Sequence, residues 1–144
     1  MGQTASGAFD GSGTGTFPGG AAERTMVCQY DFAVHGGAVS SIAIGTLPTG
    51  VSVVGGFMVV ETVVAGAGAT VGIDSEATSD IVTAAAVSGA PWSTTGKKAI
   101  NPKRNTPETT SITTTQLRSI NVTITAEVLT AGKFKLYLYV QNAV

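Results

Sequence analysis

The sequence predicts an all-β protein, an antiparallel two-sheet sandwich, and three observations lead to this fold class. Apolar and polar residues alternate over several segments, and a period of two places each set on one face of a strand. Glycine and proline, which favour turns, separate these segments. The spacing gives roughly seven or eight short strands. Because closing or doubling a sheet protects its edges, we expect a jelly roll first and an immunoglobulin-like sandwich second.

Residues 1–22 form a glycine-rich N-terminal arm, and the sandwich is expected over residues 23–144. The arm interleaves glycine with serine, threonine and alanine, so it has too little apolar surface to build a core and would be flexible alone. Phe9 and Phe17 interrupt this pattern. They are candidate partner-binding residues that could anchor the arm in pockets on a neighbour, or they are incidental aromatic residues in a tail.

Alternation over 25–34 predicts a first strand, and alternation over 39–45 predicts a second. The Leu-Pro-Thr-Gly run at 47–50 reads as a turn. A long β-branched strand follows over 51–64, with Gly55-Gly56 as a bulge or bend.

A short strand is expected over 70–74. Ser79-Asp80 then precedes the alanine-rich run 81–86, a helix N-cap signal that predicts a short helical turn or loop. Several prolines make 89–107 an irregular excursion, and the threonine-rich segment 108–115 is expected to be an edge strand.

Two alternating runs near the C-terminus, 120–128 and 134–140, are joined by a short link that contains Gly132. This pattern predicts a β-hairpin. The residues expected to face the core are Ile120, Val122, Ile124, Ala126, Val128, Phe134, Leu136, Leu138 and Val140. Tyr137 and Tyr139 then lie on the opposite face, where large aromatic side chains favour a protein interface, and we expect a homotrimer.

No arrangement typical of catalysis is visible, so we expect no enzyme and no cofactor. The single cysteine, Cys28, reads as a buried apolar residue and the single histidine, His35, as a loop residue. Asp74, Glu76 and Asp80 cluster on a turn, but their spacing matches no calcium loop and we expect no metal. A net charge of −1 gives no reason to expect nucleic acid as a partner. No apolar stretch approaches the ~20 residues that cross a bilayer, so no membrane partner is expected either.

One loop concentrates positive charge. It holds half of the lysine and arginine residues of the chain, namely Lys97, Lys98, Lys103 and Arg104. Such a patch can dock an acidic surface or phosphates, and a solvated loop is the alternative.

Four segments resemble the small cement, or capsid decoration, proteins of tailed bacteriophages. They are LPTGV at 47–51, VVET at 59–62, ATVGID at 69–74 and LTAGKF at 129–134. The resemblance covers roughly residues 38–141 and is a pattern of strands and turns without a catalytic motif. It implies a jelly roll that trimerises on the capsid exterior after synthesis in the host cytoplasm. It also implies that the chain clamps neighbouring subunits of the major capsid protein and so stabilises the capsid.

A glycan- or receptor-binding sandwich module of a phage head fibre or tail is the alternative function. It would need exposed aromatic and polar groups gathered in a cleft, and Trp92, Tyr137 and Tyr139 are the plausible stacking residues.

Overall fold

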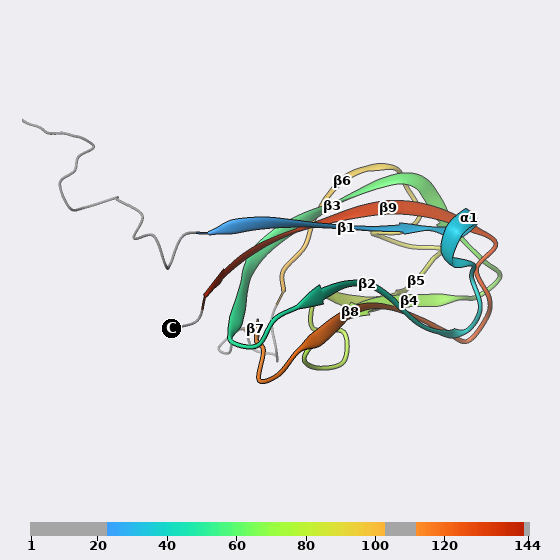
Figure 1. Ribbon diagram of the computed structural model, residues 1–144. Helices are drawn as coiled ribbons and strands as arrows, with labels where there is room; N and C mark the ends of the chain where they lie inside the picture. Colours follow the sequence, from blue (N-terminus) through green and yellow to red (C-terminus); the bar gives the residue numbers. More distant parts are fainter. Residues whose placement is uncertain (1–22, 103–111, 143–144) are drawn as a thin grey trace, which may run out of the picture.

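The computed structural model describes residues 23–102 and 112–142. Within these ranges the chain forms nine strands and one short helix, and two antiparallel sheets pack face to face (Figure 1). The predicted all-β sandwich is confirmed. The elements are β1 (Arg24–Asp31), α1 (Phe32–His35), β2 (Ser40–Leu47), β3 (Val51–Ala65), β4 (Thr70–Asp74), β5 (Val82–Ala86), β6 (Gly96–Ala99), β7 (Ile112–Thr113), β8 (Arg118–Thr125) and β9 (Ala131–Asn142).

The chain repeatedly crosses from one sheet to the other. Sheet A has the strand order β1-β9-β3-β6, with β7 also paired to β3, and sheet B has the order β2-β8-β4-β5. Strands that pair are therefore distant in sequence: Arg24 of β1 lies opposite Val140 of β9. β9 and β3 occupy the centre of sheet A, and β8 and β4 occupy the centre of sheet B.

The predicted C-terminal hairpin is wrong. β8 pairs with β2 and β4 in sheet B, whereas β9 pairs with β1 and β3 in sheet A. The two strands face each other across the core instead of lying side by side. Alternation identifies the buried face of a strand, but it does not identify the strand's hydrogen-bonding partner.

The link between β8 and β9 is not a tight turn, because it forms a hydrogen bond with the link between α1 and β2. β8 ends at Thr125, Ala126 takes a φ of 73°, and the Leu129 N–H donates to the Gly37 carbonyl at 2.8 Å. Ala126 and Val128 are therefore not core residues, and Val128 is 52% exposed.

The rest of the face assignment is confirmed, because alternating residues of both strands are buried. The core residues that β8 and β9 supply are Ile120, Val122, Ile124, Phe134, Leu136, Leu138 and Val140. Trp92 completes this core at 0% exposure. Its ring centroid lies 5.3 Å from that of Phe134, and its indole N–H donates to the Val71 carbonyl at 3.2 Å. Trp92 is thus not available to stack on a ligand.

The helical turn or loop expected over 81–86 is wrong, since this segment contains strand β5. Asp80 is buried, and its carboxylate accepts hydrogen bonds from the backbone N–H groups of Ser75, Glu76 and Ala77. The Asp80 side chain, which was expected to cap a helix, thus closes the turn that precedes it. The segment 89–107 is not wholly irregular, because it contains β6, and its residues 103–107 lie outside the described part.

The first strand ends at Asp31, three residues before the predicted end. The Asp31 carboxylate accepts from the Ala33 N–H at 3.0 Å and starts the single turn of α1. The strands expected over 39–45, 51–64 and 70–74 are present as β2, β3 and β4. Of the edge strand expected over 108–115, the structure shows the two residues of β7, and 103–111 are not described.

The predicted bulge in β3 is confirmed, with a shift in the pairing register to β9 between Val53 and Gly55. Gly56 has a φ of 158°, and a Cβ atom there would lie 2.3 Å from the Tyr137 carbonyl oxygen. Only glycine allows the two backbones to approach this closely. The bulge also reverses the faces of the strand, so Val53 and Met58 both point inward.

Candidate protein-docking face

The outer face of sheet A carries an aromatic platform, defined here as Phe57, Tyr137 and Tyr139. Tyr137 and Tyr139 alternate with the buried Leu136 and Leu138 on β9, so the strand period turns them outward. Phe57 lies directly opposite Tyr137 on β3. All three side chains are half-buried. An aromatic surface at the centre of a sheet is thus accessible to a partner.

The rings are ordered by contacts with one another. The Phe57 and Tyr137 ring centroids are 4.6 Å apart with an interplanar angle of 10°, and the Tyr139 ring is tilted against Phe57 at 6.2 Å. The Lys97 Nζ on β6 lies 4.3 Å from the Phe57 centroid. An aromatic pair contributes about 0.5–1.5 kcal/mol beyond its buried area, and an exposed cation–π contact about 0.5–1 kcal/mol. These contacts fix the rings before any partner binds.

Apolar residues extend the platform across sheet A. Val27 on β1 lies opposite Tyr137 and is 55% exposed, and Ala99 on β6 lies opposite Phe57. Beside this row, the Nζ atoms of Lys133 and Lys135 each lie 3.6 Å from a carboxylate oxygen of Glu61. An apolar centre next to paired charges has the composition of a protein interface, with a core and a polar rim.

The outer face of sheet B has a different chemistry. Its strands β2, β4, β5 and β8 contain no aromatic residue. The Ser41 and Thr123 hydroxyl oxygens are 3.1 Å apart, and Thr123 donates to the Asp74 carboxylate at 3.1 Å. These short polar side chains bond to one another, and the strands of sheet B offer no comparable aromatic anchor.

The structure brings together three of the predicted site residues, Tyr137, Tyr139 and Lys97. Lys98 is next in sequence but does not join them, because its Nζ donates to the Thr94 hydroxyl. The other four predicted residues, Phe9, Phe17, Lys103 and Arg104, lie outside the described residues.

Phe57 is the member of the platform that sequence reasoning missed. The residues before the Gly55-Gly56 bulge and those after it have opposite parity, so alternation counted from Val51 does not give the face of Phe57. The Gly55-Gly56 pair was the sequence signal for this bulge. A bulge there, counted as one extra residue, places Phe57 outward together with Val59.

The single cysteine and the single histidine both take part in the packing of the fold. Burial raises the pKa of the Cys28 thiol to about 11, so the reactive thiolate is disfavoured at neutral pH. His35 ends α1, its ring lies 5.6 Å from that of Tyr30, and its Nδ1 accepts from the Asp31 N–H at 3.1 Å.

The acidic cluster is also engaged in contacts that hold loops. Arg118 binds both carboxylate oxygens of Glu76, at 2.8 and 3.0 Å, and the Thr115 hydroxyl donates to the same carboxylate at 2.7 Å. These hydrogen bonds, chiefly from Arg118, lower the pKa of Glu76 to about 2. Burial raises the pKa of Asp80, and its backbone hydrogen bonds oppose that rise. Among the residues that the structure describes, no group of three or more histidine, cysteine or acidic side chains could hold a metal ion.

The platform is a face and not a cleft. Two pockets of the described part, with volumes of about 400 and 350 Å³, lie elsewhere, between β5 and β6 and beside the start of β1. No aromatic side chain lines either of them. The geometry therefore suits contact with another protein surface better than enclosure of a small molecule.

None of the family models, curated proteins and solved structures compared with this chain matches it. Over 23–102 and 112–142, no helix has the length and apolar character needed to cross a bilayer.

Proposed function

We propose that this chain is a structural virion protein that binds the outside of a phage capsid. It acts as a homotrimer and stabilises the capsid by clamping neighbouring subunits of the major capsid protein. The observation that carries the proposal is the aromatic platform, since Phe57, Tyr137 and Tyr139 form an ordered cluster at the centre of one sheet. Aromatic residues in the middle of an apolar patch are the groups that contribute most to protein–protein affinity.

The strand order supports the jelly-roll form of this proposal. A jelly roll has eight strands in two sheets, and the two orders β1-β9-β3-β6 and β2-β8-β4-β5 contain eight strands, with β7 added at an edge. Successive strands mostly alternate between the sheets, as the long connections of such a fold require. Two such sheets packed over one apolar core give a folded body that could span neighbouring capsid subunits.

The test uses phage heads assembled without this chain and the purified full-length chain. We expect Tyr137→Ser to weaken binding to the heads by at least tenfold, because the ring that stacks on Phe57 is lost. Asn121→Ser is the matched control, since Asn121 is a half-buried, outward-facing residue on the central strand β8 of sheet B. Co-sedimentation with heads measures occupancy, and equal loss for both variants would mean that the platform is not the docking face.

The glycan- or receptor-binding alternative would use the same exposed rings. Stacked Phe57 and Tyr137 could pack against a sugar ring, but the aromatic side chains lie apart from both pockets. Chemical-shift changes at Tyr137 on adding oligosaccharides, without binding to heads, would favour that alternative.

A further inference from the structure

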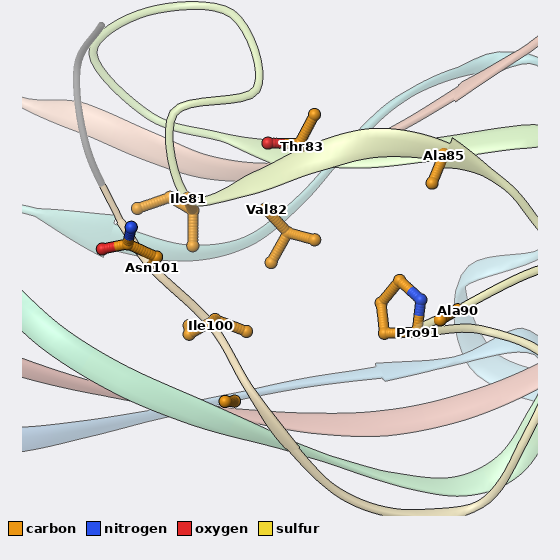
Figure 2. Close-up of a pocket in the computed structure, with 9 residues that line it drawn as sticks. Ile81, Val82, Thr83, Ala85, Ala90, Pro91, Ile100 and Asn101 are labelled. Carbon is orange, nitrogen blue, oxygen red and sulfur yellow. The ribbon is translucent and has the colours of Figure 1, made fainter. Parts of the chain in front are cut away.

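An apolar pocket of about 400 Å³ lies between the two sheets, on the side where β5 and β6 run (Figure 2). Val82 of β5 and Ile81 just before it line one side, and Pro91 and Ile100 line the other from the segments around β6. Ile81 and Val82 belong to the hydrophobic core, and Ile100 packs against it. The pocket is thus an opening into the core. An engineered cavity of about 150 Å³ binds benzene, so this volume is ample for a phenyl ring.

The pocket lies between two free strand edges. Within the described residues, β5 pairs only with β4 and β6 pairs only with β3. The outer edges of β5 and β6 therefore present backbone N–H and C=O groups without strand partners. An extended peptide that lies along such an edge gains main-chain hydrogen bonds and can place alternate side chains in a pocket.

The N-terminal arm of this chain has the composition of such a peptide. Phe9 and Phe17 are its only aromatic residues, and the residues around them are mostly glycine, serine, threonine and alanine, which allow close backbone approach. Pro18 follows Phe17 and favours an extended backbone at Phe17. Phe17 is also the nearer of the two to the folded domain, and a shorter tether gives a higher effective concentration.

The position of β1 favours the arm of a second copy over the chain's own arm. The arm joins the domain at β1, and β9 and β3 separate β1 from β6 in sheet A. The strands at the two edges are roughly 14 Å apart at the usual spacing. A fully extended chain from Arg24 to Phe17 spans roughly 25 Å, so length alone would permit the chain's own arm to cross the sheet. To reach its own pocket, the arm would have to run across the strands of a sheet and then around an edge, without backbone partners on the way.

We propose that the pocket between β5 and β6 receives Phe17 from the arm of a second copy of this chain. Each copy then donates an arm on the β1 side and accepts one on the β5–β6 side. Such head-to-tail contacts form a closed ring when the rotation between copies closes. This inference rests on the homotrimer in the proposed function but requires no capsid.

Disulfide trapping between single-cysteine variants tests the contact. Gly19→Cys places a thiol two residues from Phe17 and retains both phenylalanines, and Thr83→Cys places one among the pocket-lining residues. Cys28 can stay, because it is buried and its thiol pKa is raised to about 11. The two full-length variants carry different tags, are co-expressed so that both enter the same assembly, and are oxidised in air with a copper–phenanthroline catalyst. Only contact between two chains can give the disulfide-linked heterodimer.

We expect at least tenfold more heterodimer with Thr83→Cys than with the matched control Thr125→Cys, an exposed threonine at the end of β8. Adding Phe17→Ser to the Gly19→Cys chain should abolish the excess, and Phe17→Leu should retain part of it. Equal yields at Thr83 and Thr125 would overturn the pocket as the site.

A chain that carries both Gly19→Cys and Thr83→Cys separates the two possible sources of the arm. If it closes an internal disulfide and the co-expressed single variants give no heterodimer, the arm belongs to the same copy and the proposal is wrong. Wild-type levels of head binding by Phe17→Ser would leave this test unaffected, because the cross-link is measured on the free protein.

Discussion

The two outer faces of the sandwich differ, although the two inner faces are alike. Sheet A presents stacked rings, a lysine over one of them and a row of ion pairs. Sheet B presents hydroxyl and carboxylate groups that bond to one another. Both sheets turn branched apolar residues inward, and sheet A adds the buried rings of Tyr30 and Phe134. The inner residues therefore account for the fold, and the outer residues of sheet A supply the candidate docking face.

The largest expected effect tests whether the inner faces are alike. Leu136→Ala in sheet A and Ile120→Ala in sheet B each remove a fully buried side chain. Each should lower the free energy of unfolding by about 2–5 kcal/mol, because a cavity remains where the side chain was. Urea denaturation of the two variants measures the loss. If either residue could be truncated without loss, its face assignment would be reversed.

A smaller effect on stability is expected when a buried carboxylate, Glu76, is compared with an exposed one, Glu61. The Glu76 side chain, between β4 and β5, is 3% exposed and holds Arg118, whereas Glu61 on sheet A is 32% exposed and lies beside two lysines. The pKa of Glu76 falls from 4.5 to about 2 in the folded protein. Its ionised form therefore contributes stability above pH 4.5, and that contribution is lost as the pH falls toward about 2.

Glu76→Gln should accordingly lower the melting temperature at neutral pH, and its difference from the wild type should shrink between pH 4.5 and about 2. Glu61→Gln is the matched control and should change the melting temperature little, since exposed pairs contribute about 0–1 kcal/mol. Thermal melts followed by circular dichroism over this pH range provide the measurement. A deficit of Glu76→Gln that stayed constant down to the acid limit would contradict the role assigned to the carboxylate.

The smallest effect concerns the edge of the platform. Lys97→Gln removes the ammonium above Phe57 and should lower stability by about 0.5–1 kcal/mol. Lys98→Gln is the neighbouring control, because Lys98 contacts Thr94 and not a ring. Chemical denaturation of both variants, with the ring signals of Phe57 followed by NMR, compares them. Identical ring shifts in the two variants would show that Lys97 does not order the platform.

The sequence was sufficient for the faces of most strands but not for their partners. Alternation identified Leu136 as inward and Tyr137 as outward, because this depends only on the strand period. It failed for the pairing of β8 and β9, since a crossover between sheets and a hairpin turn can both follow a short link that contains glycine. It also failed at Phe57, where the bulge at Gly55-Gly56 changes the parity.

The candidate site was predictable in part for the same reason. Tyr137 and Tyr139 follow from local alternation, but the position of Lys97 over Phe57 depends on the pairing of β6 with β3, which are separated by two strands in sequence. The segment that supplies β6 also contains proline and glycine, which favoured an irregular loop over a strand. Asp80 shows a similar limit, because a residue that caps a helix can equally close a turn that precedes it.

The place of β9 in sheet A has a consequence for biosynthesis. β9 lies between β1 and β3, so the ribosome has to make residues up to 142 before the earlier strands can find their central partner. Contacts between residues this far apart in sequence form slowly and late. Tyr137 and Tyr139 are on that same strand, so the aromatic platform is assembled in the same step as the sheet. A nascent chain therefore lacks the complete aromatic platform until the synthesis of β9 is finished.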